Sequence, residues 1–156
     1  MDNRISKHIS YKEATFSQTA TRKDIDNTPS PEVLERMKTL AENVFEPLRA
    51  HVGGPIKINS FYRSIMLNTA IGGSKSSQHT RGEAIDIDDT FGHMSNKDMF
   101  TFIKDELDFD QLIWEFGDDK NPAWIHVSYV SPQNNRRRML KAEKKDGKTV
   151  YSIMNA

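Results

Sequence analysis

Apolar residues recur at helical spacing over residues 31–49, which gives the clearest helix signal in the chain. Ser30 is a candidate N-cap, Pro31 suits a first helical turn, and Glu32 lies where the helix dipole favours a negative charge. Pro47 is expected to distort the last turn. The apolar stripe consists of Val33, Met37, Leu40, Ala41, Val44 and Leu48. We therefore predict one long amphipathic helix here.

Shorter apolar stretches with two-residue alternation predict the strands of a sheet. They lie at residues 56–62, 83–88, 110–116, 124–130 and 150–153. A charged hairpin turning at Asp146 and Gly147 leads into the last of them. A short helix is predicted at residues 67–70, and Ser95 with Asp98 resembles a capping box before a helix that ends near Leu107.

The order of these elements predicts the fold class. Strands and helices do not alternate regularly, so we predict an α+β fold with a small antiparallel sheet and segregated helices. Residues 1–29, rich in Ser, Thr, Asn and charge, look irregular and are expected to pack on the rest. No repeat or linker divides the chain, so residues 1–156 are expected to form one domain, and we expect a monomer.

The composition of the chain excludes several classes of function. The 22 basic and 22 acidic side chains balance, so no general charge attracts nucleic acid or an anionic membrane. The chain has no cysteine, which excludes disulfides, thiolate zinc sites and cysteine nucleophiles. No stretch resembles a signal peptide or is long enough to span a membrane. We expect a chain made in the cytoplasm, with neither a nucleic-acid partner nor membrane insertion.

Candidate chemistry is concentrated around the strand at residues 83–88. By alternation, Asp86 and Asp88 share one face of the strand, and Ile85 and Ile87 lie on the other. His79 lies in the loop that enters this strand, and Gly82 allows a tight turn between them. An acidic pair on a strand face is unusual for packing and ordinary for a cation site.

A second histidine, His126, lies by alternation on the more polar face of the strand at residues 124–130. Two imidazoles, one carboxylate and an open fourth position make a catalytic zinc site, which lowers the pKa of its water toward ~7. Judged by spacing alone, metal binding is no better an explanation than a structural histidine with aspartates that only face solvent. The remaining histidines, His8, His51 and His93, lack a comparable setting and are expected at the surface.

Three segments resemble motifs of a known family. Residues 77–86 fit the pattern Ser-x-His-x-x-Gly-x-Ala-x-Asp, residues 60–64 resemble its Ser-x-Tyr-Arg segment, and residues 124–128 resemble its second histidine motif. From about Ile9 to Tyr151 the chain thus resembles the zinc D-Ala-D-Ala carboxypeptidases. That family includes phage L-alanyl-D-glutamate endolysins and shares its fold with the zinc domain of hedgehog proteins. The chain is most similar to a phage and prophage subgroup.

The resemblance implies specific roles. The implied ligands of one zinc ion per chain are His79, Asp86 and His126. Arg63 is implied to steady a substrate carboxylate or the oxyanion, because a guanidinium stays charged and grips a carboxylate with two parallel bonds. Ser77, together with Tyr62, is implied to contact the substrate.

One position departs from the better-known members, which carry a Glu or Asp general base three residues before the second histidine. Here that position is Ala123. Glu115 is our candidate base: alternation lets it face away from the core, and it faces the metal if its strand pairs antiparallel with that of His126. Leu112, Trp114 and Phe116 are expected on the opposite face. Asp118 and Asp119 are alternatives, although both lie in a predicted turn.

The implied activity is zinc-dependent hydrolysis of peptide bonds in peptidoglycan stem peptides, by a DD-carboxypeptidase or an endopeptidase. The absence of a signal peptide suits a phage endolysin that reaches the wall by holin-type release. Ala123 keeps open a non-catalytic zinc domain that binds wall peptide or a protein partner. A structural phage-particle component is a third alternative, which the intact ligand set disfavours. The run of residues 136–138, all arginine, is expected to be a solvated face more than a site for an anionic wall polymer.

Overall fold

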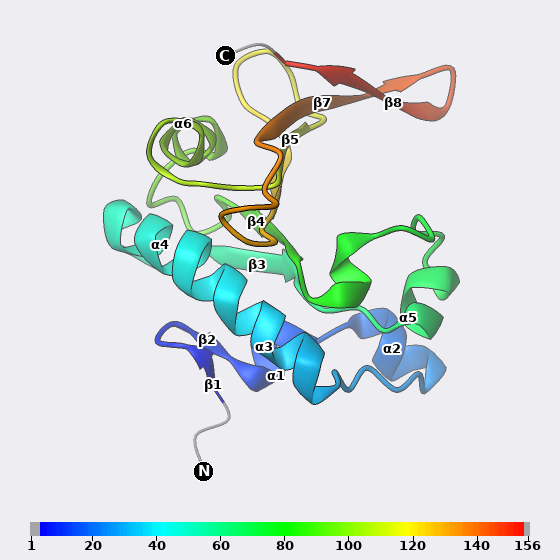
Figure 1. Ribbon diagram of the computed structural model, residues 1–156. Helices are drawn as coiled ribbons and strands as arrows, with labels where there is room; N and C mark the ends of the chain where they lie inside the picture. The colour runs from blue at the N-terminus through cyan, green and yellow to red at the C-terminus, as the bar shows by residue number, and fades with distance from the viewer. Residues whose placement is uncertain (1–3, 155–156) are drawn as a thin grey trace.

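A six-stranded sheet forms the centre of the computed structural model, which describes residues 4–154 (Figure 1). The strands are β3 (Lys57–Ser60), β4 (Ala84–Asp88), β5 (Gln111–Glu115), β6 (Trp124–Ser128), β7 (Arg138–Lys145) and β8 (Lys148–Ile153). Their order in the sheet is β3-β4-β6-β5-β7-β8. With helices packed against this sheet, the predicted α+β class is confirmed.

The sheet differs from the purely antiparallel arrangement predicted, because β5 and β7 run parallel. β6 ends beside the start of β5, where Leu112 pairs with Val127. The chain then passes over this end of β5, and Arg138 N–H donates to Asp110 O as β7 begins. β7 must therefore run in the same direction as β5. The predicted hairpin is confirmed; its last strand, β8, is longer than the predicted residues 150–153, and its first strand, β7, was not predicted.

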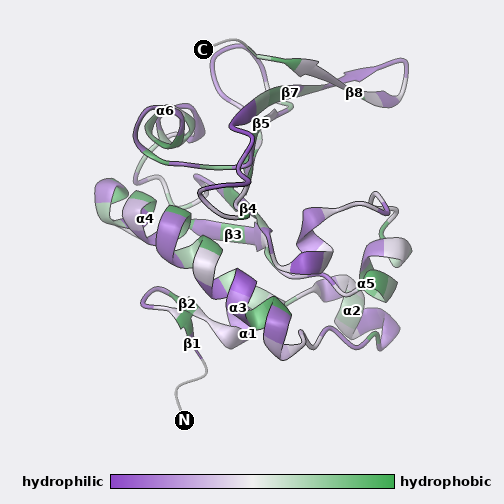
Figure 2. Cartoon of the chain, in the orientation of Figure 1, coloured by the Kyte–Doolittle hydropathy of each residue, from purple (hydrophilic) through white to green (hydrophobic). Residues whose placement is uncertain are grey.

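The long predicted helix is present as three consecutive segments that cover one face of the sheet. These are α3 (Pro31–Leu40), a π-helical turn (Ala41–Phe45) and α4 (Glu46–Val52). Pro47 was predicted to distort the last turn of the helix, but the irregular turn lies before Pro47. There the N–H of Glu46 donates to the carbonyl oxygen of Ala41, five residues earlier, which makes the turn wider than in an α-helix. Figure 2 shows hydrophobic and hydrophilic residues interspersed along this helix. Its buried stripe, led by Met37, Leu40, Val44 and Leu48, packs in the main core.

Residues 4–23 are not irregular as predicted. They form β1 (Arg4–Ser6), β2 (Ile9–Ser10), α1 (Tyr11–Thr15) and α2 (Gln18–Lys23), of which β1 and β2 pair as a small second sheet. Ser10 and Ser17 cap the two helices. Ile5, Ile9 and Ala14 are buried in the main core. Each element is too short for its periodicity to show in the sequence.

Two further helices were predicted and are confirmed, α5 (Ile65–Ala70) and α6 (Asn96–Glu106). The Ser95 hydroxyl accepts from the N–H of Asp98 at 3.1 Å, as a capping residue should. Between residues 4 and 154, none of the helices is both long and apolar enough to cross a lipid bilayer.

Candidate metal centre

The two faces of the sheet differ in character because side chains alternate along each strand. On the face toward the helices, Ile85 lies opposite Val127, and the other buried aliphatic residues follow the same register. On the other face, Asp86 lies directly opposite His126. Their side chains meet, with His126 Nδ1 3.0 Å from Asp86 Oδ1.

His79 reaches the same face from a 3-10 turn (Gln78–Arg81) that precedes β4. The turn closes at Gly82, whose φ is +74°, and a Cβ there would lie 2.8 Å from the Val33 carbonyl oxygen. The predicted need for glycine at this position is thereby confirmed. His79 is 2% exposed, so its ring is fixed between the turn and the sheet.

The hydrogen bonds of His79 define its tautomer. Its Nδ1 lies 2.8 Å from the Phe61 carbonyl oxygen, which can only accept, so Nδ1 carries the proton and donates. In the neutral ring Nε2 then presents a lone pair; it lies 3.3 Å from Asp86 Oδ2 and has no hydrogen-bond partner. A buried lone pair that faces a carboxylate oxygen is unfavourable unless a proton or a metal ion lies between them.

His79, Asp86 and His126 together form a group able to hold a metal ion, with ligand atoms within 4.8 Å of one another. Two imidazole nitrogens and one carboxylate oxygen are a ligand set of catalytic zinc, and the Phe61 carbonyl supplies the outer hydrogen bond that orients a ligating histidine. Burial raises the pKa of Asp86, but the positive charge that His79 carries when protonated, with the hydrogen bond and charge of His126, outweighs it and holds that pKa below its usual range. Asp86 thus stays a carboxylate, as a ligand must.

Glu115 faces this cluster from β5, which pairs antiparallel with β6 as the sequence argument required. Ile113 lies opposite His126, and Glu115, two residues on, shares its face. The side chain is 7% exposed. Burial is the main reason that the pKa of Glu115 is raised to about 7; the charge of His126 partly opposes this rise and that of Asp86 adds to it. A carboxyl group with a pKa near 7 can both accept and donate a proton at neutral pH.

The Peptidase M15 family model matches residues 7–128 of the chain, more than half of its length. The chain belongs to the peptidase M15 family. Peptidases of this family are zinc-dependent, which agrees with the ligand types and tautomer found here. No curated protein matches the chain significantly. The match ends with β6, so the β7–β8 hairpin lies beyond it.

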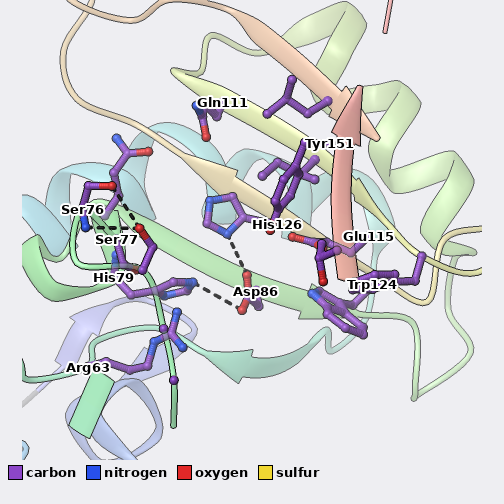
Figure 3. Close-up of a pocket in the computed structure, with 18 of the residues that line it drawn as sticks. Arg63, Ser76, Ser77, His79, Asp86, Gln111, Glu115, Trp124, His126 and Tyr151 are labelled. Carbon is purple, nitrogen blue, oxygen red and sulfur yellow. Dashed lines mark hydrogen bonds and ion pairs between the residues drawn. The ribbon is translucent and has the colours of Figure 1, made fainter. Parts of the chain in front are cut away.

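The metal cluster opens into a cavity of about 860 Å³ (Figure 3). Among the residues predicted for the site, Arg63 and Ser77 line this cavity with the three candidate ligands and Glu115. The Arg63 Nε is buried without a hydrogen-bond partner, and burial lowers the pKa of this guanidinium, against the charge of Asp86. The Ser77 hydroxyl also accepts from the His79 N–H at 3.3 Å and so supports the turn.

Tyr62 does not line the cavity. Its ring packs in the main core, and its pKa is raised by burial and by Asp26 and Tyr11, which lie on the N-terminal side of the molecule. Phe116 was predicted to lie on the core face of its strand, but it lines the cavity. Its φ of +57° ends β5 and breaks the alternation on which that prediction relied.

The alternative carboxylates lie elsewhere. Asp88 Oδ1 accepts from Asn96 Nδ2 at 2.8 Å, and its other oxygen from the Thr90 hydroxyl. Asp118 caps a turn by accepting from the N–H groups of Lys120 and Asn121. Asp119 pairs with Lys141, and both turn aspartates line a smaller neighbouring cavity. None of the three lines the cavity that contains the metal cluster.

Sequence reasoning missed Trp124 and Tyr151 among the residues that line the cavity. Trp124 shares the strand face of His126, so alternation alone could have identified it. Tyr151 lies on the last strand, and only the pairing of β8 with β7 brings it here. No local signal could have identified it.

The arginine run is partly structural. Arg136 Nε and Nη2 donate to the two oxygens of buried Asp110, at 3.0 and 2.7 Å. Arg137 donates to the Leu107 carbonyl at 2.8 Å and lies over the Phe109 ring. Asp110 also accepts from Gln78 at 3.0 Å, which ties the turn carrying His79 to the start of β5 and, through Arg136, to the segment before β7.

We expect Asp110→Asn to lower the free energy of unfolding at pH 7 by about 2 kcal/mol. This is below the ~3–5 kcal/mol typical of a fully buried pair, because the Arg136 side chain is 52% exposed. Burial raises the pKa of Asp110, but Arg136 and Gln78 outweigh it, so the net direction is downward. The stabilisation is therefore present at neutral pH and is lost as the pH falls below about 4.

Urea unfolding of the parent and variant at pH 7 and pH 3 measures this difference. Asp105→Asn is the matched control, because that carboxylate is 54% exposed and should change the free energy of unfolding by less than about 0.5 kcal/mol. Equal losses in the two variants would show that Asp110 has no special structural role.

Proposed function

We propose that this chain hydrolyses peptide bonds in the stem peptides of bacterial peptidoglycan, as a zinc-dependent endopeptidase or carboxypeptidase of the phage endolysin type. The observation that carries the proposal is the position of Glu115, a buried carboxyl group with its pKa raised to about 7, on the same sheet face as the His-Asp-His cluster. A site that only stores a metal has no need of such a group.

His79, Asp86 and His126 are the proposed ligands of one zinc ion per chain. Zinc held by three such ligands with an open position lowers the pKa of its water toward ~7 and polarises a carbonyl group. His79 offers Nε2 because its Nδ1–H is committed to the Phe61 carbonyl. The intact strand pairing of Asp86 with His126 holds the other two ligands in register.

Glu115 is the proposed general base and acid. It takes a proton from the attacking water and delivers it to the nitrogen of the leaving amine. Its main-chain carbonyl accepts from the N–H of Ala123 at 2.9 Å, so it lies beside the position where better-known relatives carry the base. A carboxylate on the neighbouring strand thus compensates for Ala123.

Arg63 is proposed to bind the substrate carboxylate or the developing oxyanion. Its guanidinium forms no side-chain hydrogen bond or ion pair within residues 4–154, and it lines the cavity, so its terminal nitrogens are free to form two parallel bonds with such a group. Ser77, at the same end of the cavity, is proposed to contact the substrate backbone.

We expect Arg63→Lys to keep the zinc content and reduce kcat/KM about tenfold or more, because lysine retains the charge and loses the two-pronged geometry. Steady-state kinetics with metal analysis of the same samples measures both quantities. Arg138→Lys is the control, since Arg138 is exposed and does not line the cavity. Parent-like kinetics in Arg63→Lys would place Arg63 outside the reaction.

A non-catalytic zinc domain that binds wall peptide or a protein partner is the second candidate, and Ala123 is the observation in its favour. Incubating purified peptidoglycan with the chain, with and without a chelator, separates the two. The proposal expects release of new amino groups that stops with the chelator and returns with zinc. The second candidate expects binding without release.

A further inference from the structure

The β7–β8 hairpin, which lies beyond the part of the chain matched by the family model, forms one wall of the cavity. Across the sheet, Glu115 lies opposite Ala142, and Ala142 opposite Tyr151. Tyr151 therefore shares the sheet face of Glu115. Lys144 and Thr149 pair with each other one step further along this face and also line the cavity.

All three of these residues, which line the cavity, carry side chains that can donate hydrogen bonds. Within residues 4–154, none of them hydrogen-bonds to another protein group, and the only ring contact is Lys144 Nζ over Phe116, 5.7 Å from its centroid. Burial, Glu115 and Asp86 raise the pKa of Tyr151, so its hydroxyl remains a donor at neutral pH. Hydrogen-bond donors that have no partner within the protein are suited to a ligand that carries hydrogen-bond acceptors.

The floor beneath them is apolar. Ile113, Leu140 and Ala142 form a small buried cluster, with Phe116 packed against it, apart from the main core. Leu140 and Ile113 line the cavity. This end of the cavity thus combines an aliphatic floor with a rim that carries an ammonium and two hydroxyl groups.

Arg63 lies at the other end. Figure 3 shows Asp86 and His126 between Arg63 and Tyr151. A peptide that spans the cavity with its reacting bond at the metal cluster therefore has one end near Arg63 and the other near the hairpin. Each end has a cation, Arg63 or Lys144, that forms no ion pair among the described residues.

We propose that the hairpin forms a second carboxylate subsite, in which Tyr151 and Lys144 bind an in-chain carboxylate of the substrate peptide. This carboxylate lies on the opposite side of the cleaved bond from the group held by Arg63. The inference rests on the proposed function, in that it specifies the substrate as a peptide with carboxylates on both sides of that bond. The hairpin then determines specificity.

The probes are two synthetic stem peptides that differ at one group. The first contains D-glutamate with a free α-carboxylate, and the second carries the same group as an amide; both keep the C-terminal carboxylate. Calorimetric titration into the zinc-loaded full chain gives Kd for each. We expect the parent to bind the free acid about tenfold more tightly than the amide, as hydrogen bonds to a charged group imply.

Tyr151→Phe should weaken binding of the free acid about three- to tenfold, and Lys144→Gln should remove most of the preference over the amide. Ser152→Ala is the matched control, because it removes a hydroxyl from the same strand on the opposite face. It should bind both peptides like the parent. Zinc content should be equal in all four proteins.

The inference is overturned if both hairpin variants retain the parent preference, or if the parent binds neither peptide or binds both equally. Hydrolysis by the same samples keeps this result separate from the proposed function. A parent that shows the preference but cleaves nothing contradicts the peptidase and supports the subsite. A parent that cleaves wall peptides with no dependence on the hairpin contradicts only the subsite.

Discussion

Glu115→Gln is expected to keep the fold and the zinc content and to lower kcat at least about a hundredfold. Glutamine nearly preserves size but cannot take up a proton, and general acid–base catalysis is typically worth about 10²–10⁴ in rate. Glu115 is 7% exposed and lies on the sheet face of Asp86 and His126, so no bulk water replaces its function easily. Single-turnover kinetics on a wall peptide measures the loss.

The matched controls are Asp118→Asn and Asp119→Asn. These carboxylates also follow β5 closely in the chain but line a different cavity, so both variants should retain nearly the parent kcat. An active Glu115→Gln with an inactive Asp118→Asn or Asp119→Asn would assign the base to the turn. Full activity in all three variants would exclude a carboxylate base.

His126→Ala is expected to abolish retention of stoichiometric zinc. Even changes to the groups that orient metal ligands cost about 10–100-fold in affinity, so the loss of one of three direct ligands should cost more. His126 Nδ1 already lies 3.0 Å from Asp86, so its removal opens one side of the cluster. Zinc analysis after extensive dialysis measures retention.

His93→Ala is the control for this measurement, because His93 is exposed and lies outside the cavity. It should keep one zinc per chain. A His126→Ala protein that also keeps one zinc would contradict the ligand assignment. In that case, zinc analysis of Asp86→Asn and Asp88→Asn would show whether either carboxylate binds the metal.

The sequence predicted the centre of the site well because the relevant information is local. Alternation alone places Asp86 and His126 on the polar faces of their strands, and Gly82 marks the turn that brings in His79. The facing of Glu115 followed from the same rule once its strand paired antiparallel with that of His126. These elements are strands of five residues each, long enough for a two-residue period to be recognised.

Other features depend on distant parts of the chain or on single backbone angles. The parallel pairing of β5 with β7 depends on how the chain passes over the end of β5, and no local pattern encodes it. Tyr151 reaches the cavity only through that pairing. Phe116 departs from alternation because one positive φ ends its strand.

Chelator-sensitive hydrolysis of purified peptidoglycan tests the central claim most directly. The zinc-loaded chain should release new amino groups without new reducing sugar ends, and the Glu115→Gln protein with equal zinc should release almost none. Removal of the metal should stop the reaction, and added zinc should restore it. Zinc-loaded parent protein that binds peptidoglycan but releases no amino groups would contradict the account.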